Sequence, residues 1–344
     1  MQKTVERIIS LRRNETKDII RRIGIVTGDR LQLLNFPINR PTVAFNASIL
    51  LNGDLVEVFA RIILGYYTYA SAIVSFVIPL EEISDISKSV FNARIIISPD
   101  NKYDIWGTED PRATQIGNRK VLTYTGRTVN YFDPSIRVER TLPIIAVKNK
   151  GDSWKKLAVV RLREMKIVSD KDAFLVDIDG RLVLFHRPHT YDHTEEFLCT
   201  VTEVSETIIQ GEKIKEFLVN GTKVVLKAAP FEEKIGWGTP PIKVGKEYLL
   251  FLHGVDQETK EYKVFAVLIN RNLEIVAVTP YYVMKPKEPY EKYGDRPLVV
   301  FPCGAVKIDD KVLISYGAAD IAIGFGEIDL SEIMSILDKN RIIE

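Results

Sequence analysis

The sequence predicts an all-β fold, a five-bladed β-propeller, and three observations carry this prediction. Five tight turns recur at an almost constant interval, because Gly53, Gly117, Gly180, Gly245 and Asp310 lie 64, 63, 65 and 65 residues apart. An apolar strand enters and leaves each turn, and each repeat has room for about four short strands, the content of a propeller blade. Helical patterns are scarce between the two ends of the chain. A pair of β-sandwiches is the alternative, but it does not explain so even a period.

The two ends of the chain carry the predicted helices. Over residues 3–23, apolar residues recur at roughly helical spacing among Arg, Lys and Glu. This pattern predicts a helix within an N-terminal helical extension of residues 1–28. Residues 329–338 predict a short C-terminal helix. Residues 29–344 are predicted to form a single propeller domain. The N-terminal helix is also a candidate for a subunit contact, so a homo-oligomer stays open.

Composition and charge exclude several classes of function. The chain of 344 residues has 47 basic and 46 acidic side chains, which gives no indication of a nucleic-acid or membrane partner. Its two cysteines, Cys199 and Cys303, are far apart and suit a reducing compartment. The first residues are too charged for a signal peptide, and no apolar run is long enough to span a bilayer. We therefore expect a cytoplasmic protein, and the spacing of residues predicts no metal site.

Counting outward from each turn identifies the residues that share one end of the blades. In a hairpin, residues at equal distances from the turn lie side by side, and in a propeller the corresponding ends of all blades face the central axis. Before the turns stand Asn46, Asp110, Lys171-Asp172, Gly238-Thr239 and Cys303, and after them stand Arg61, Arg127, His186-Arg187, His253, Gly317 and Asp320. Acids and bases around one concave mouth are what binding a polyol and an anion requires.

Several of these residues also have a purely structural interpretation. Asp110 and Asp172 are residue types that cap turns, and Arg61 and Arg187 are suited to ion pairs between blades. His186 at a strand end is more often a structural histidine than a catalytic one, because histidine is intermediate in its tendency to be buried. The coincidence of so many polar residues at one repeated position is what favours a functional site.

Several motifs also follow one another along the chain. They are Gly107-Thr108-Glu109-Asp110-Pro111-Arg112, Lys171-Asp172 with His186-Arg187-Pro188, Gly236-Trp237-Gly238-Thr239-Pro240-Pro241 with His253-Gly254, and Phe301-Pro302-Cys303-Gly304-Ala305 with Gly317-Ala318-Ala319-Asp320. In this order they resemble glycoside hydrolase family 130, the β-mannoside phosphorylases and their relatives, whose fold is a five-bladed β-propeller. The resemblance runs from about Asn46 to the C-terminal region. The chain departs from the family pattern at Ala173, where a glycine is common.

The resemblance implies a role for each matching residue. Asp110 would be the general acid, the single catalytic carboxylate. The mannosyl unit would be held by Asn46, Arg61, Asp172 and Asp320. The phosphate site would consist of Arg127, Lys171, Arg187 and His253. Inorganic phosphate would be the cosubstrate of a β-mannoside oligosaccharide, and no further cofactor is implied.

The balance of acids and bases favours phosphorolysis over hydrolysis. An inverting glycosidase needs an acid for the leaving oxygen and a base for water. An inverting phosphorylase needs only the acid, together with a cationic cradle for a nucleophile that is already an anion. We therefore expect an inverting β-mannoside phosphorylase that releases α-mannose 1-phosphate and a shortened acceptor, with the proton transferred either directly or through a hydroxyl of the bound mannose. The alternatives are a β-mannoside hydrolase on the same scaffold and a non-catalytic sugar-binding propeller.

Overall fold

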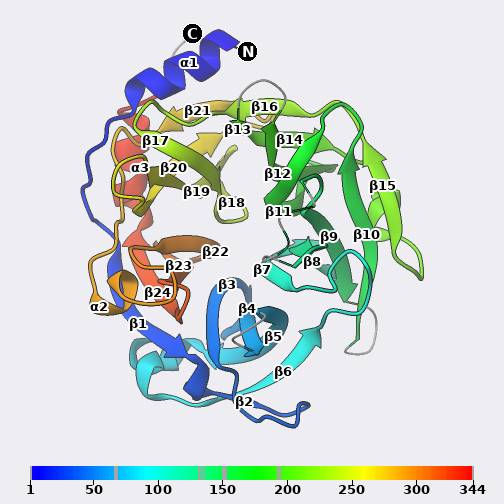
Figure 1. The fold of residues 1–344 in the computed structure, drawn as a ribbon. Coiled ribbons are helices and arrows are strands. Elements are labelled where there is room, and N and C mark those ends of the chain that lie inside the picture. Colours follow the sequence, from blue (N-terminus) through cyan, green and yellow to red (C-terminus); the bar gives the residue numbers. More distant parts are fainter. Residues whose placement is uncertain are drawn as a thin grey trace.

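Five β-sheets stand in a ring around a central axis in the computed structural model (Figure 1). It describes residues 2–65, 69–130, 133, 135, 137–148, 153–191 and 195–342. Each sheet begins with a strand beside the axis and continues outward, mostly by antiparallel pairing. The predicted all-β fold and its five blades are therefore confirmed.

The blades follow one another along the chain. The first blade contains β3 (Val43–Asn52), β4 (Leu55–Gly65), β5 (Ala70–Pro79), β6 (Phe91–Ile97) and β2 (Leu31–Leu33). The second contains β7 (Thr108–Ile116), β8 (Arg119–Arg127), β9 (Thr141–Lys148), β10 (Trp154–Leu162) and β15 (Lys215–Val219). The third contains β11 (Ile167–Ile178), β12 (Arg181–Tyr191), β13 (Glu195–Phe197), β14 (Cys199–Glu203) and β16 (Lys223–Leu226).

The last two blades complete the ring. The fourth contains β17 (Glu232–Trp237), β18 (Ile242–Val244), β19 (Glu247–Asp256), β20 (Tyr262–Ile269) and β21 (Ile275–Val278). The fifth contains β22 (Val300–Ile308), β23 (Lys311–Ala318), β24 (Ala322–Asp329) and β1 (Arg21–Thr27). The helices are α1 (Gln2–Leu11), α2 (Pro289–Lys292) and α3 (Leu330–Asp338), with short 3₁₀ helices at Gly28–Arg30, Leu80–Lys88 and Glu206–Ile209.

The five central turns lie where the repeat predicts them. Gly53, Gly117, Gly180 and Gly245 have φ angles of 58°, 55°, 84° and 62°, in the left-handed region that glycine adopts without a steric penalty. The fifth turn uses Asp309 at φ 51° instead, and aspartate is one of the few other residue types that visit this region readily. Local turn chemistry therefore explains why the period could be seen in the sequence.

The N-terminal extension differs from its prediction. Helix α1 ends at Leu11, so the helix expected over residues 3–23 is only half as long. Residues 21–27 form strand β1, which pairs antiparallel with β24 in the fifth blade, and the helical extension predicted for residues 1–28 is wrong over this stretch. The segment 21–27 is rich in β-branched residues, and an open sheet edge overrides a weak helical preference.

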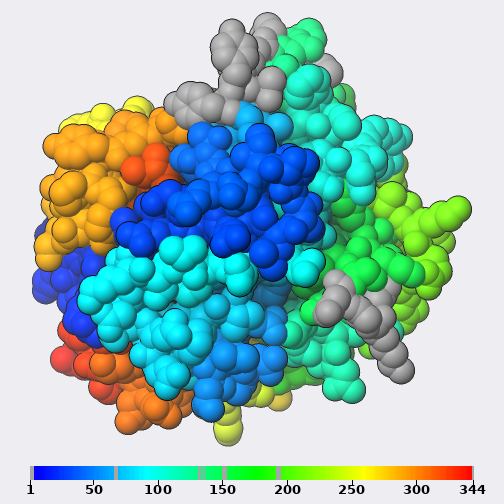
Figure 2. All heavy atoms as spheres, turned by 90° about the horizontal axis from the view of Figure 1, so that it is seen from below, coloured from blue at the N-terminus to red at the C-terminus, as the bar shows by residue number. Residues whose placement is uncertain are grey.

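This pairing joins the start of the chain to its last blade. Arg21 lies opposite Glu327 and Thr27 opposite Ala322, so the ring is closed by backbone hydrogen bonds between distant segments. Figure 2 views the molecule near this closure, with the first blade in blue and cyan beside the fifth blade in orange and red. Upstream of β1, the guanidinium of Arg12 makes two 2.7 Å hydrogen bonds to the buried carboxylate of Glu232, which fixes the extension on the fourth blade.

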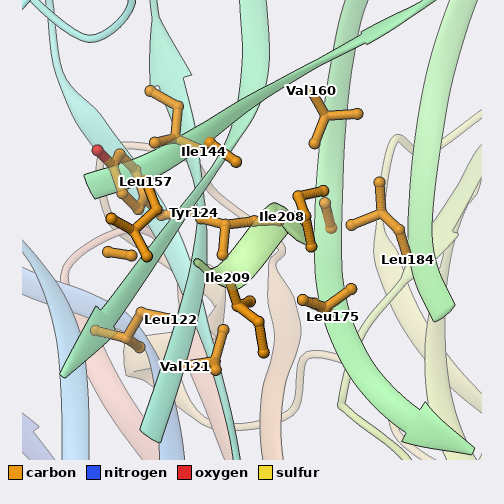
Figure 3. Packing of buried hydrophobic residues seen from close by; sticks show 14 of the residues in the cluster. Val121, Leu122, Tyr124, Ile144, Leu157, Val160, Leu175, Leu184, Ile208 and Ile209 are labelled. Atoms are coloured by element: carbon orange, nitrogen blue, oxygen red, sulfur yellow. The ribbon is translucent and has the colours of Figure 1, made fainter. Parts of the chain in front are cut away.

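The hydrophobic core fills the spaces between neighbouring blades. Figure 3 shows one such cluster, in which side chains of the second and third blades and of the short helix at Glu206–Ile209 point toward one another. The labelled residues are Val121, Leu122, Tyr124, Ile144, Leu157, Val160, Leu175, Leu184, Ile208 and Ile209. Each fully buried side chain of this size contributes about 1.5–3 kcal/mol, so this packing holds the blades in fixed relative positions. None of the helices in the described part of the chain is long and apolar enough to cross a membrane.

Candidate active site

A cavity of about 850 Å³ opens at one end of the propeller axis. Eight of the nine predicted site residues line it: Asn46, Arg61, Asp110, Lys171, Asp172, Arg187, His253 and Asp320. The other lining residues are Tyr69, Ser169, Phe197, Lys234, Tyr262, Asp295, Arg296, Val299 and Phe301. All five blades contribute to the cavity, as expected for residues at one end of a repeated hairpin.

Three of the inner strands carry the same irregularity at the cavity. The pairing register shifts between Phe45 and Ser48, between Glu109 and Arg112, and between Lys171 and Phe174. Asn46, Asp110 and Asp172 fall within these β-bulges, with φ angles of 47°, 49° and 53°. A bulge adds one residue to a strand and changes the direction of its side chain. The repeated bulge therefore directs one polar side chain per blade into the cavity.

Left-handed backbone is uncommon at residues other than glycine, although asparagine and aspartate adopt it more readily than most. Such positions persist where the surrounding structure fixes them. Asp320 adds a fourth case, at φ 55° in the turn between β23 and β24. The concentration of these conformations around one cavity is typical of functional sites.

Asp110 is held by two donors on one of its oxygens. Its Oδ1 atom accepts hydrogen bonds from Asn46 Nδ2 at 2.7 Å and from Arg61 Nη1 at 3.1 Å. The side chain lines the cavity although the residue is only 8% exposed. With Oδ1 engaged by these two donors, Oδ2 is the oxygen left to interact with a ligand.

Glu109, the neighbour of Asp110, is completely buried beneath the cavity floor. Its carboxylate lies 3.0 Å from Arg61 Nη2, 3.2 Å from Lys171 Nζ and 3.5 Å from Arg127 Nε. Burial opposes ionisation, but the positive charges of Arg61, Lys171 and Arg127 outweigh it and hold the pKa of Glu109 well below its usual range. Glu109 is therefore a permanent anion that neutralises part of the positive charge around Asp110.

Asp172, His253 and Arg187 form a second cluster of side chains at the cavity. Asp172 Oδ2 lies 2.6 Å from Arg187 Nε and 3.8 Å from His253 Nε2. Burial acts to raise the pKa of Asp172, but the charge of Arg187 dominates and lowers it to about 2. Burial also lowers the pKa of His253 to about 3, against the attraction of Asp172, so the imidazole is neutral at physiological pH. His253 can therefore donate or accept a hydrogen bond there, but it adds no charge.

Two glycines of the sequence motifs make room for these side chains. A Cβ atom on Gly236 would lie 2.3 Å from Asp172 Oδ2 and 2.3 Å from His253 Cε1. A Cβ atom on Gly317 would lie 1.7 Å from Asn46 Oδ1. Real Cβ atoms do not approach other atoms so closely, so both positions require glycine for the observed arrangement.

Asp320 has the opposite titration behaviour to Asp172. Burial raises the pKa of Asp320 to about 6, although Arg61 and Arg296 act to lower it. It is partly buried at the cavity wall. A carboxylate that readily takes up a proton near neutral pH is suited to hydrogen bonding with sugar hydroxyls in either protonation state.

Arg127 is the predicted site residue that lies outside the cavity lining. Its Nε donates to the backbone oxygen of Trp106 at 2.9 Å, and its Nη2 donates to that of Tyr69 at 2.8 Å. It is 1% exposed and contacts Glu109 from behind. The structure therefore places Arg127 as a support for Glu109, and its predicted contact with phosphate would require rearrangement.

His186 is a buried structural histidine, which was the alternative to a functional role in the sequence analysis. Its Nδ1 lies 2.8 Å from Asp170 Oδ2 and its Nε2 lies 2.9 Å from Thr202 Oγ1. The residue is fully buried and does not line the cavity. It braces the third blade, whereas the adjacent Arg187 faces the ligand space.

Sequence reasoning missed several cavity residues, notably Lys234, Arg296 and Tyr262. Lys234 had a usable signal, because it precedes Gly236 by two residues on the same strand and therefore shares its face. Arg296 stands in the connection between β21 and β22, outside the repeated hairpins, and had none. Among the described residues, no group of three His, Cys, Asp or Glu side chains is arranged to hold a metal ion.

Comparison with known proteins identifies the family of this chain. Residues 10–339 match the sequence profile of glycoside hydrolase family 130, described as β-1,4-mannooligosaccharide phosphorylase. The chain belongs to glycoside hydrolase family 130. Within this family it is 28% identical, over 84% of its length and 91% of the relative's, to the β-1,2-mannobiose phosphorylase of Thermoanaerobacter sp. (strain X514).

Solved structures of family 130 share the fold at lower identity. The β-1,2-mannobiose phosphorylase from Listeria innocua, in complex with β-1,2-mannobiose, superposes with a TM-score of 0.73 at 19% identity, over 93% of this chain and 99% of the other. A family 130 structure from a study of hydrolases that target β-1,2 mannosidic linkages in Candida mannan superposes with a TM-score of 0.63 at 18% identity, over 84% of each chain. Family 130 thus contains β-mannoside phosphorylases and also hydrolases.

Proposed function

We propose that this member of family 130 is an inverting β-mannoside phosphorylase. The observation that carries the proposal is that one cavity holds Asp110 together with several cations. Asp110 keeps its Oδ2 atom for a ligand, and Lys171, Arg187 and the hydrogen-bonding His253 line the same cavity. An acid together with cations is what phosphorolysis needs, because phosphate brings its own negative charge.

Each residue then has a defined task. The hydroxyls of the mannosyl unit are held by Asn46, Arg61, Asp172 and Asp320. A phosphate oxygen attacks the anomeric carbon from the face opposite the leaving group, and the glycosidic C–O bond breaks as the new C–O bond forms. The Asp110 proton passes to the leaving oxygen, directly or through a hydroxyl of the bound mannose. The products are α-mannose 1-phosphate and an acceptor shortened by one mannose.

Hydrolysis is the second candidate, because carboxylates as well as cations line the cavity. Asp295 and Asp320 accompany Asp110 and Asp172 there, and family 130 includes hydrolases. For hydrolysis, one of these carboxylates would have to activate a water molecule on the face of the sugar opposite Asp110. The ion pair between Asp172 and Arg187 at 2.6 Å makes Asp172 a poor base for this purpose.

Product analysis tests the proposal. The enzyme is incubated with a panel of β-1,2- and β-1,4-linked mannosides, with and without inorganic phosphate, and mannose 1-phosphate and mannose are quantified. We expect phosphate-dependent release of mannose 1-phosphate, which Asp110→Asn abolishes and Asp54→Asn, at the exposed first turn, leaves unchanged. Free mannose in equal amounts without phosphate would establish the hydrolase instead. Binding of the mannosides without turnover in the unaltered enzyme would indicate a sugar-binding propeller.

A further inference from the structure

Arg112 ends the first of the sequence motifs, and the proposed function gives it no task. It is completely buried and lies on β7, two residues after Asp110. Its Nη1 atom donates a hydrogen bond to the backbone oxygen of Asp110 at 2.8 Å, and its Nε atom donates to the backbone oxygen of Gly238 at 2.6 Å. Arg112 thus connects the bulge that carries the proposed acid to a carbonyl elsewhere in the ring.

The two carbonyls belong to blades that are not neighbours. Asp110 lies in the second blade, whereas Gly238 directly follows β17 of the fourth blade, and the third blade stands between them in the ring (Figure 1). The guanidinium of Arg112 suits this connection, because its donors are planar and keep fixed relative directions. A lysine ammonium is a compact group on a flexible stem and would hold two carbonyls less precisely.

The backbone of the bulge at Asp110 needs such a donor. The ladder between β7 and β8 pairs Glu109 and Arg112 with residues of β8, and it leaves Asp110 and Pro111 without a register partner. Proline has no N–H to donate, and Asp110 has a left-handed φ of 49°. A buried carbonyl without a donor costs free energy, so the hydrogen bond from Arg112 replaces a ladder bond that the bulge lacks.

The other two bulges show that this arginine is not a general requirement of the bulge. The residue two positions after the left-handed one is Ser48 in the first blade and Phe174 in the third blade. In the described part of the chain, no carboxylate oxygen lies within 4.0 Å of the Arg112 guanidinium, and its Nη2 atom has no hydrogen-bond partner. A buried charge without a counterion is costly. Among the three bulges, the one with the proposed acid is the one that carries this charge.

We propose that Arg112 is a positioning residue for the proton transfer: by joining the carbonyls of Asp110 and Gly238, it fixes the direction from which the Asp110 carboxyl meets the bound glycoside. The proposal rests on Asp110 being the general acid, and it applies whether phosphate or water is the nucleophile. Arg112 does not line the cavity, and its Cζ atom lies 5.3 Å from the centre of the Phe301 ring, which does. Arg112 therefore acts through Asp110 and not by contact with the substrate.

Steady-state kinetics with a β-mannoside and inorganic phosphate test the proposal first. We expect Arg112→Met to lower kcat about tenfold to a hundredfold, the effect of a misplaced catalytic group, while the KM for the mannoside stays within about threefold of the wild type. Arg112→Lys keeps the charge and should show a smaller fall in kcat, and it serves as the second variant if the methionine variant does not fold. Circular dichroism shows whether each variant is folded.

Arg119→Met is the matched control. Arg119 lies on β8 of the same blade and also donates to a backbone carbonyl, that of Ile209 at 3.0 Å. It is exposed and lies outside the cavity lining. Its kcat is expected to stay within about twofold of the wild type, because a surface substitution away from the site has little effect.

Leaving-group dependence separates a misplaced acid from a general loss of structure. The substrates are a series of aryl β-mannosides whose phenols differ in acidity, and release of the phenol is measured, so that phosphorolysis and hydrolysis count alike. A strongly acidic phenol departs without a proton and does not need the acid. Both Arg112 variants should therefore turn over the mannoside of the most acidic phenol within about threefold of the wild type and lose most rate with the least acidic one. Asp110→Asn is the reference for complete loss of the acid.

The outcomes separate this role from the proposed function. An unchanged kcat in both Arg112 variants would overturn the proposal, and so would a change confined to KM. An equal loss of kcat for all leaving groups would assign Arg112 to the folding of the blade alone. If Asp110→Asn itself lost all aryl mannosides equally, Asp110 would not be the acid and the basis of the proposal would fail. Phosphate-independent turnover by the wild type would refute the phosphorylase function and leave the role of Arg112 intact.

Discussion

Replacing Glu109 by glutamine should strongly destabilise the folded protein. The carboxylate lies within 3.5 Å of three cations and is completely buried, so Glu109→Gln leaves Arg61, Lys171 and Arg127 without their shared counterion. Removing one partner of a buried charge pair typically costs about 3–5 kcal/mol. We expect a loss of about 3 kcal/mol, near the lower end, because the glutamine oxygen still accepts one hydrogen bond. Denaturant titration at pH 7 measures this loss as a change in the free energy of unfolding.

The pH dependence of the loss tests its electrostatic origin. The pKa of Glu109 is lowered in the folded state, so its stabilising contribution is complete above the unfolded pKa of about 4.3 and declines as the pH falls below it. The difference between wild type and Glu109→Gln should therefore shrink from about pH 4 downward. Glu203→Gln is the control, because Glu203 pairs with Arg181 at 2.7 Å on the surface, and should cost less than about 1 kcal/mol. Equal losses in the two variants, or a difference independent of pH, would refute the reasoning.

Three further substitutions probe the cavity. Burial raises the pKa of Asp320 to about 6, so the stability linked to its protonation is lost as the pH rises from about 4 through 6. Asp320→Asn should thus be up to about 3 kcal/mol more stable than wild type at pH 8, and a lower stability in denaturant titration would contradict this expectation. The variant should also bind mannosides less tightly. Gly317→Ala should lower kcat at least about tenfold by displacing Asn46 from Asp110, and unchanged kcat in a folded variant would argue against this contact. Arg127→Met should lower kcat while the KM for phosphate stays within about twofold, and a large rise in that KM would place Arg127 at the phosphate after all.

The repeated parts of the molecule were predictable because their causes are local. Glycine in the left-handed region marks each of the first four turns, and the apolar strands beside it follow from their composition. Counting from these turns found Asn46, Asp110 and Asp172, because the blades place equivalent residues at equivalent distances from the axis. The bulges that direct their side chains inward were not predictable, since they depend on pairing between strands.

The parts that escaped prediction depend on distant contacts or on side-chain direction. Strand β1 pairs with β24, about 300 residues later, and the sequence of residues 21–27 does not reveal that this distant strand leaves an open edge. Arg127 was placed correctly at the end of a strand, but its side chain turns toward Trp106 behind the cavity wall. Arg296 reaches the cavity from a connection outside the repeat, and only the folded structure brings it to Tyr262.

Phosphorolysis itself is tested most directly by finding the source of the oxygen that becomes bonded to the anomeric carbon of the mannosyl product. The enzyme cleaves a β-mannoside in oxygen-18 water with unlabelled inorganic phosphate, and mass spectrometry of the products locates the label. If phosphate is the nucleophile facing Asp110, the mannosyl product is mannose 1-phosphate and its anomeric oxygen carries no label. Oxygen-18 at the anomeric position of free mannose, released at the same rate without phosphate, would show that water attacks and would contradict the assignment of the cavity cations to phosphate.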